Sequence, residues 1–332
     1  FFSHGSTVKT QTGDVVYYSD LVANFNEELR MARLSFNATI PEIRFPNGAI
    51  GLRPLRISEG PGKLIGIMGA SGAGKTTLLN VLAGLEQPAQ GRIFINGIDV
   101  IAQREKVQGA IGYVSQDDLL IEELTVYQNL YYNAKLCFSQ FSEEQLHERV
   151  MVTLESLGLE QRKDLRVGNA LEKVISGGQR KRLNIALELI REPAVLFLDE
   201  PTSGLSSRDS ENVIDLLKEL SLKGKLVFAV IHQPSSDIYK MFDKMIIMDT
   251  GGYLAYYGPP VEAVTYFKRS THQVDSNRGQ CMVCGNVNPE QIFNIIEAKV
   301  VDEYGQPTAK RKVTPVQWGE LYQNSFKSAR VE

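Results

Sequence analysis

Short apolar runs of strand length recur along the chain, and most are followed by a loop and a helical pattern. The clearest runs are Lys63–Met68, Ala110–Ser115, Val195–Leu198 and Lys225–Ile231. Before the third run, a stripe from Leu183 to Ile190 follows the i, i+3, i+4, i+7 spacing of a half-buried helix. Repeated strand–loop–helix units predict an α/β fold with a parallel core sheet.

Two patterns predict antiparallel strands beside this core. Asn96-Gly97, between residues 92–96 and 98–100, is typical of a tight hairpin turn, because both residue types tolerate a positive φ. Residues 244–248 and 253–257 pair across a Thr-Gly-Gly turn in the same way. The sequence therefore predicts a mixed sheet and an antiparallel β subdomain.

A helical block interrupts the α/β pattern at about residues 117–190. Thr125–Gln128 and Ser142–Gln145 are capping boxes, in which a hydroxyl and a Gln satisfy free backbone N–H groups at the start of a helix. We expect this block to form an inserted helical subdomain. The predicted segments are an N-terminal extension at 1–41, a main domain at 42–268 and a C-terminal extension or linker at 269–332.

Composition narrows the class of protein. The 332 residues are 43% hydrophobic and 23% charged, with a formal net charge of −3, so no global positive excess favours nucleic acid as a partner. No run approaches the ~18–20 apolar residues of a membrane-spanning helix. Because the sequence begins at Phe1 rather than Met, we expect a piece of a longer protein. Three cysteines and no signal peptide favour a reducing, cytosolic compartment.

The segment Gly69–Thr76 matches the phosphate-binding pattern G-x-x-x-x-G-K-[ST] in full. It follows an apolar strand and opens a helix, so backbone N–H groups and the helix N-terminus can surround a phosphate. Lys75 can reach the β- and γ-phosphates, and Thr76 can ligate Mg²⁺. The predicted nucleotide-binding residues here are Gly69, Ala70, Ser71, Gly72, Ala73, Gly74, Lys75, Thr76 and Thr77.

Two carboxylates end the apolar strand Val195–Leu198. A buried strand would carry Asp199 rigidly to the phosphate loop, where it can hold the Mg²⁺ shell. Glu200 would then lie where a carboxylate can polarise an attacking water.

Ser176 is a good helix cap and can open a second anion site, although for this segment taken alone a simple Ser-Gly-Gly loop is the favoured interpretation. The two glycines after Ser176 leave the free N–H groups of that helix open to an anion. Two phosphate sites far apart in one sequence suggest two chains that enclose nucleotides head to tail.

In their order and spacing, these motifs resemble the nucleotide-binding domain of ATP-binding-cassette (ABC) proteins. The resemblance covers Glu42–Lys268 and rests on Gly69–Thr76, Gln116, Ile175–Gln179, Leu196–Glu200 and His232. The chain looks most like the G subfamily, the White-type exporters, at Ser176–Arg182, Pro201–Leu205, His232–Asp243 and Asn288–Glu290. The resemblance implies a P-loop NTPase core of the ABC type.

The resemblance also implies a role for each matching residue. The implied catalytic residues are Lys75, Gln116, Glu200 as general base and His232 as γ-phosphate contact. The implied Mg²⁺ ligands are Thr76, Gln116 and Asp199. Ser176, Gly177, Gly178 and Gln179 would meet the nucleotide held by a second copy of the module. Phe45, upstream of the phosphate loop, is a candidate to stack on adenine and equally a candidate for plain core packing.

One position departs from the family pattern. After Pro201–Leu205 the family has an Asp, and this chain has Ser206. The resemblance gives that Asp a part in coupling the two sites of the dimer. The rate of hydrolysis and the symmetry of the sites therefore stay open, while nucleotide binding is unaffected.

Cys281 and Cys284 form a Cys-x-x-Cys pair, with His272 as a candidate third ligand for zinc. Structural zinc usually takes two such pairs, and Cys137 lies far away in the sequence. Two reduced cysteines in a turn are the favoured interpretation, and a metal site is the alternative.

Three functions share this ATPase core: the engine of an exporter, a soluble ABC ATPase of DNA repair or chromosome organisation, and a nucleotide-gated binding module with little turnover. The stretch from Gln116 to Ser176 is too short for a long coiled-coil arm, and no basic excess favours DNA. The G-subfamily likeness favours a transport-coupled ATPase at the cytoplasmic face of a membrane. The expected cofactors and partners are ATP, Mg²⁺, a second copy and a transmembrane domain, and no nucleic acid.

Overall fold

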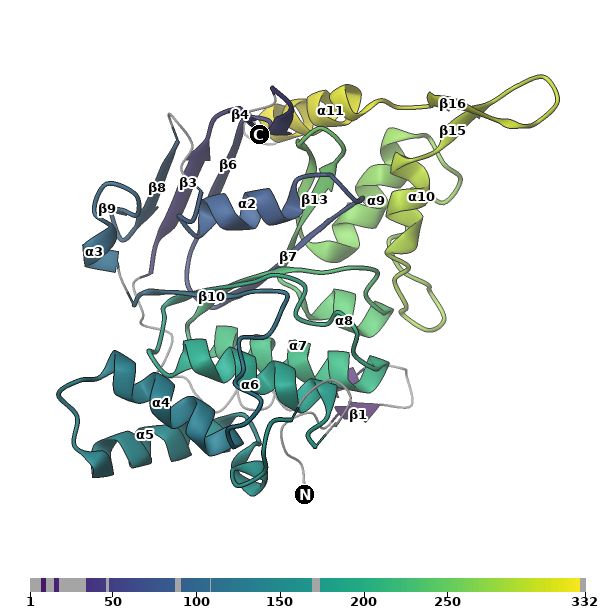
Figure 1. Cartoon of the computed structure of the whole chain (residues 1–332). Coiled ribbons are helices and arrows are strands. Elements are labelled where there is room, and N and C mark those ends of the chain that lie inside the picture. The colour runs from purple at the N-terminus through teal and green to yellow at the C-terminus, as the bar shows by residue number, and fades with distance from the viewer. Residues whose placement is uncertain are drawn as a thin grey trace.

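A six-stranded sheet forms the centre of the computed structural model, which describes residues 7–9, 15–17, 34–45, 48–86, 91–107, 109–168 and 174–328 (Figure 1). In spatial order its strands are β10 (Ile111–Val114), β11 (Val195–Leu198), β12 (Leu226–Val230), β7 (Lys63–Gly69), β13 (Lys244–Asp249) and β14 (Tyr253–Gly258). All neighbours pair parallel except β13 and β14, which pair antiparallel. The mixed sheet predicted from the sequence is confirmed.

A second, antiparallel sheet has the order β6-β3-β8-β9. Its strands are β3 (Phe36–Ile40), β6 (Leu55–Glu59), β8 (Arg92–Ile95) and β9 (Ile98–Asp99). The β8–β9 turn has a φ of 51° at Asn96 and 79° at Gly97, as its Asn-Gly sequence predicts. A short pair, β4 (Ile43–Arg44) with β5 (Ile50–Leu52), lies against the phosphate loop, where Gly51 faces Gly74.

Strand β3 lies between β6 and β8, so the predicted boundary at residue 42 cuts through this sheet. Phe36, Ala38 and Ile40 are buried while the residues between them are exposed, which is the period-two pattern of a half-buried strand. The folded unit therefore begins before residue 42. The helix α3 (Arg104–Val107) follows β9, and the N-terminal strands β1 (Thr7–Lys9) and β2 (Val15–Tyr17) form a separate antiparallel pair.

The central sheet has a core on each face. Strand β11 contributes alternate residues to the two cores. Val195 and Phe197 pack toward the antiparallel sheet. Leu196 and Leu198 pack toward the helical side. On the first side α2 (Lys75–Leu82) lies between the two sheets (Figure 1). The Phe197 ring stacks there on the Phe228 ring, with centroids 5.2 Å apart. These rigid layers fix the ends of the strands in space.

Helices cover the other face. They are α4 (Val126–Cys137), α5 (Glu143–Ser156), α6 (Gly177–Leu189), α7 (Ser207–Leu222) and α8 (Ser236–Met241), with a 3₁₀ turn η2 (Glu160–Arg162). The capping boxes predicted at Thr125 and Ser142 are both present. Helices α4 and α5 form the body that projects below the sheet in Figure 1.

The C-terminal part contains α9 (Pro260–Ser270), α10 (Glu290–Ile296), the hairpin β15 (Lys299–Val301) with β16 (Pro307–Arg311), and α11 (Pro315–Ser328). Trp318 of α11 is fully buried, with its ring 5.0 Å from that of Phe267. Tyr322 of the same helix donates a hydrogen bond to the Tyr257 carbonyl of β14 (3.2 Å). Helix α11 is thus packed onto the main fold. No helix in the described ranges is both long and apolar enough to cross a bilayer.

Candidate functional site

Four neighbouring strands end at one edge of the central sheet and deliver the predicted site residues there. Strands β10, β11, β12 and β7 are parallel and adjacent, so their carboxyl ends lie side by side. Gln116 follows β10, Asp199 and Glu200 follow β11, His232 follows β12, and the loop Gly69–Thr76 follows β7. The carboxyl edge of an open parallel sheet is where ligands bind in α/β folds.

The phosphate loop depends on glycine at two positions. Gly72 has a φ of 74° and Gly74 has a φ of 91°, a region that side chains disfavour. A Cβ on Gly74 would lie 2.5 Å from the Gly51 carbonyl oxygen, a contact with backbone that cannot yield. The loop therefore curls tightly against β5 and turns directly into α2.

Lys75 points back into this loop. Its ammonium donates hydrogen bonds to the carbonyls of Gly69 and Ala70, both at 3.0 Å. Burial lowers the pKa of Lys75, and the charges of Glu200 and Asp199 oppose that change. The amine is thus held at the centre of the loop, close to two carboxylates.

Asp199 lies beside the start of α2. The Thr76 hydroxyl donates to Asp199 Oδ1 at 3.4 Å, which joins the ends of β11 and the phosphate loop. Burial raises the pKa of Asp199, with the Glu200 charge adding to it, while the Thr76 hydrogen bond and the Lys75 charge lower it. A carboxylate and a hydroxyl together provide the oxygen ligands that Mg²⁺ prefers.

Glu200 is held by side chains from both neighbouring strands. The His232 Nε2 lies 2.7 Å from Glu200 Oε1, and Gln116 Nε2 donates to Glu200 Oε2 at 3.2 Å. Glu200 has a φ of 46° and Gln233, next to His232, has a φ of 38°. Such backbone conformations in residues other than glycine cost energy and concentrate at functional sites.

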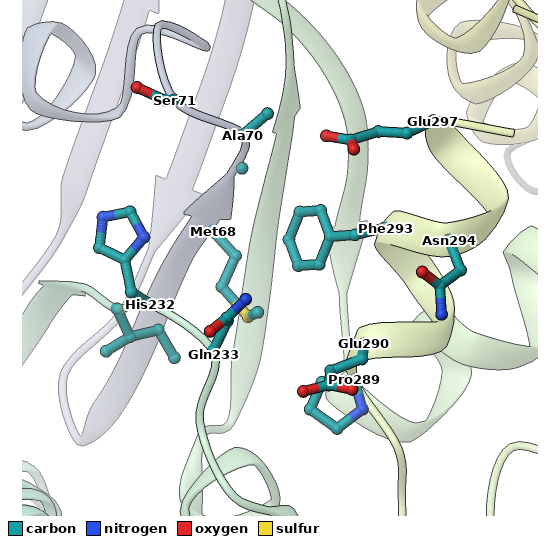
Figure 2. A pocket seen from close by; sticks show the side chains of 12 residues that line it. Met68, Ala70, Ser71, His232, Gln233, Pro289, Glu290, Phe293, Asn294 and Glu297 are labelled. Atoms are coloured by element: carbon teal, nitrogen blue, oxygen red, sulfur yellow. The ribbon is translucent and has the colours of Figure 1, made fainter. Parts of the chain in front are cut away.

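A cavity of about 560 Å³ opens next to this cluster (Figure 2). One wall is formed by Ala70 and Ser71 of the phosphate loop and by His232 and Gln233. The opposite wall is helix α10, from which Phe293 and Glu297 point into the cavity. The C-terminal part of the chain therefore reaches the nucleotide edge of the main fold.

Residues 52–203 match the protein family described as ABC transporter, and residues 232–328 match the family described as ABC-2 type transporter. The first match spans the phosphate loop and both carboxylates of the site. The chain belongs to the ABC transporter family. Its first matched segment is the ATP-binding domain of that family.

Relatives of this ABC protein are members of the G family. The chain is 40% identical to ABC transporter G family member 26 of Arabidopsis thaliana over 65% of its own length and 31% of that protein. It is 40% identical to Protein white of Drosophila melanogaster, over 65% of this chain and 32% of that protein. It is also 40% identical to the broad substrate specificity ATP-binding cassette transporter ABCG2 of Sus scrofa, over 60% of this chain and 30% of that protein. The chain therefore spans about a third of the length of these relatives.

A solved structure of an ATP-binding cassette of an ABC transporter, in its ADP conformation, has the same fold. It superposes with a TM-score of 0.60 at 24% identity, covering 68% of this chain and 91% of that one. The predicted fold class, an ABC-type P-loop ATPase core with a mixed sheet, is confirmed.

The signature segment of this ABC domain lies at the start of α6. The Ser176 hydroxyl accepts from the Gln179 N–H, and the Gln179 side chain accepts from the Ser176 N–H, so the cap is a full capping box. Its neighbours are α7 and the turn before it: a Cβ on Gly178 would lie 2.6 Å from Asp209 Oδ1 of α7, and one on Gly177 would lie 3.2 Å from Leu205, which precedes that helix. The structure thus joins the signature segment to the region of Ser206.

Ser206 serves as the N-cap of α7. Its hydroxyl accepts from the Asp209 N–H (3.2 Å) and donates to Asp209 Oδ2 (3.0 Å). Asp209 therefore places a carboxylate one turn after position 206, against the signature helix. Asp209 was not among the predicted site residues, although a Ser followed by Asp three residues on is a helix-start signal.

Phe45 lies near the phosphate loop rather than in the core. It is 39% exposed, and a Cβ on Gly51 would lie 2.8 Å from its ring. The Gly51 carbonyl in turn contacts Gly74. This position is compatible with adenine stacking, which stays a prediction.

Lys181 is a further residue that sequence reasoning missed. It is a buried cation on α6, and its ammonium donates to the Gln116 carbonyl at 2.8 Å. Burial lowers the pKa of Lys181, and the charges of Asp118 and Asp117 oppose this. In the sequence, Lys181 is simply the middle residue of an Arg-Lys-Arg run in the signature helix. The family resemblance assigns no role to that run, so nothing singled out Lys181.

Proposed function

We propose that this chain binds Mg-ATP at the carboxyl edge of the central sheet and hydrolyses it there, in a sandwich of two copies. The observation that carries the proposal is the contact of Glu200 with both His232 (2.7 Å) and Gln116 (3.2 Å) beside the phosphate loop. These partners come from two other strands and hold the carboxylate at the ligand edge of the sheet.

The phosphates would bind to the backbone N–H groups of the loop and to Lys75. The loop wraps a phosphate because its glycines allow the N–H groups to converge, and α2 adds the partial positive charge of its N-terminus. Thr76, Asp199 and Gln116 would provide the oxygen ligands of the Mg²⁺ that accompanies ATP. That ion neutralises charge on the phosphate oxygens. The proximity of Thr76 to Asp199 supports this arrangement.

Glu200 would accept the proton of the attacking water. His232 fixes one carboxylate oxygen and Gln116 the other, so the base is oriented before substrate arrives. His232 also borders the cavity beside Ala70 and Ser71, where the γ-phosphate end of a bound nucleotide would point. Lys75 would stabilise the charge that develops on the transferred phosphoryl group.

A second copy would complete each site. The N-terminus of α6, capped by Ser176, offers free N–H groups for an anion. In the same chain this segment adjoins α7. We assign it to the nucleotide of the partner copy, with Asp209 positioned to influence how the two sites communicate.

In the full-length protein, the domain would power a transmembrane part at the cytoplasmic face of a membrane. The relatives named as transporters and the match of residues 232–328 to the ABC-2 type transporter family support this assignment over DNA repair.

ATP turnover as a function of protein concentration, with Mg²⁺ present, tests the proposal. Turnover should rise more steeply than linearly, and Glu200→Gln should lower it by about 10²–10⁴-fold, the usual contribution of a general base. Glu297→Gln is the matched control, because this carboxylate borders the same cavity from α10. ATP binding without turnover at any concentration would instead favour a nucleotide-gated binding module. If Glu200→Gln and Glu297→Gln lowered ATP turnover equally, Glu200 would not be the general base.

A further inference from the structure

The loop between α9 and α10 carries two thiols that the nucleotide site does not use. Cys281 and Cys284 are both exposed, and Met282 and Val283 between them are 76% and 92% exposed. Within the part of the chain that the structure describes, no group of three or more His, Cys, Asp or Glu side chains is placed to hold a metal ion. The zinc alternative, with His272 as third ligand, therefore has no ligand set, and the pair must be considered as thiols.

A closed turn holds the two cysteines together. The Gly285 N–H donates to the Cys281 carbonyl (2.9 Å), and the Cys281 N–H donates to the Asn286 carbonyl (2.8 Å). Cys284 lies inside this turn, and its thiol forms a hydrogen bond with that of Cys281. The two sulfur atoms are therefore neighbours, as exchange between them requires.

The surroundings of Cys281 and Cys137 shift the pKa values of these two thiols in opposite directions. Hydrogen bonds from the backbone of Cys284 and of Val283, and from the Cys284 thiol, hold the pKa of Cys281 below its ordinary value. Desolvation raises the pKa of Cys137. Because the thiolate is the nucleophile in disulfide exchange, Cys281 is the attacking residue and Cys137 is the less reactive comparison.

We propose that Cys281 and Cys284 form a reversible exchange site for small disulfides of the glutathione class, and that its state is transmitted to the nucleotide site through α8. The Cys281 thiolate attacks one sulfur of the small disulfide, breaks its S–S bond and releases a thiolate. The Cys284 thiolate then attacks Cys281 Sγ and releases the second. Two protein thiols are oxidised to a disulfide, the small disulfide is reduced to two thiols, and two protons pass to the leaving thiolates.

Two hydrogen bonds fasten this turn to α8. Lys240 Nζ donates to the Gly285 carbonyl (3.4 Å), and the Val287 N–H donates to Ser236 Oγ (2.9 Å). Ser236 is the first residue of α8, and His232 lies just before that helix.

The turn also leads directly into α10. That helix forms one wall of the cavity beside the phosphate loop, and His232 borders the other (Figure 2). A disulfide between Cys281 and Cys284 would make the turn more rigid, and with it the segments that lead to α10 and contact α8. We therefore expect oxidation to restrict the movement of His232 relative to the phosphate loop.

Thiol titration and intact-mass measurement of the whole 332-residue chain test the exchange step. The Cys137→Ser variant, equilibrated with oxidised glutathione, should lose both remaining thiols and two hydrogens in mass, with no glutathione retained. Dithiothreitol should restore both thiols. In the same background Cys284→Ser should instead keep glutathione on Cys281, because the resolving thiol is gone. A stable glutathione adduct with both cysteines present, or two persistent free thiols, would overturn the site.

ATP turnover tests the transmission step and rests on the proposed function. Oxidation should lower turnover reversibly by about fivefold or more, the usual scale of coupling between sites. The double variant Cys281→Ser/Cys284→Ser should not respond to the oxidant. If the fully oxidised chain hydrolysed ATP at the same rate as the reduced chain, the proposed effect of the disulfide on the nucleotide site would be wrong. If the reduced chain shows no turnover, the proposed function fails, the thiol result stands by itself, and the affinity for a fluorescent ATP analogue becomes the readout of transmission.

Discussion

Substitution of Gly74 by Ala tests whether the shape of the phosphate loop depends on its approach to β5. Gly74 has a φ of 91°, and a Cβ there would lie 2.5 Å from the Gly51 carbonyl oxygen. Gly72, in the same loop, has a φ of 74°, but a Cβ there would meet nothing within 4 Å. Both glycines have a positive φ, but only Gly74 is crowded by backbone, so Gly72→Ala is the matched control.

The expected costs follow from those surroundings. A left-handed conformation costs a residue with a Cβ about 1–2 kcal/mol, and both variants incur this. Overpacking against rigid neighbours adds about 1–3 kcal/mol, and only Gly74→Ala incurs that. Gly74→Ala should therefore lower the free energy of unfolding by about 2–5 kcal/mol and Gly72→Ala by about 1–2 kcal/mol.

Urea denaturation of both variants, without nucleotide, measures these costs. The midpoint should fall further for Gly74→Ala while the slope of the transition stays unchanged. A fluorescent ATP analogue should then show the larger loss of affinity for Gly74→Ala, because the loop must move away from Gly51 to accept the methyl group. Equal losses of stability in the two variants would refute the reasoning that the backbone contact with β5 sets the shape of the loop.

Three further predictions concern the C-terminal part and the charges of the site. Trp318→Ala should lower the free energy of unfolding by about 3–5 kcal/mol, because the side chain is fully buried; urea denaturation checks this. Arg311→Ala should cost about 3–5 kcal/mol, because the Asp249 side chain is 0% exposed and would lose its cation; faster proteolysis of the β15–β16 hairpin should accompany the loss. Burial raises the pKa of Asp199 and lowers the pKa of Lys75. Affinity for Mg-ATP, followed by titration calorimetry across pH, should therefore fall on the acid side as Asp199 gains a proton and on the alkaline side as Lys75 loses one, with both limits nearer neutrality than for ordinary side chains.

Features fixed by local chemistry could be predicted from the sequence. The Asn96-Gly97 turn and the capping boxes at Thr125 and Ser142 depend on residues within one turn of each other, and all are present. The phosphate loop is likewise a single segment between a strand and a helix.

Features fixed by packing between distant segments could not. Strand β3 is short and precedes the regular pattern, and only its pairing with β6 and β8 makes it part of the sheet. The role of Lys181 beside Gln116 depends on how α6 crosses the sheet. The contact of Asp209 with the signature helix likewise needs the packing of α6 on α7. Sequence patterns describe neighbouring residues, so they do not predict how two distant helices or strands pack on each other.

Mixing two variants that are each inactive tests the central claim most directly. Lys75→Ala removes the phosphate contact of its own loop, and Ser176→Arg blocks the signature helix that would serve the partner. If the site is shared between two copies, each variant alone is inactive in ATP turnover, and the mixture regains part of the wild-type rate because mixed dimers contain one intact site. No recovery in a mixture whose components both fold and associate would contradict the account.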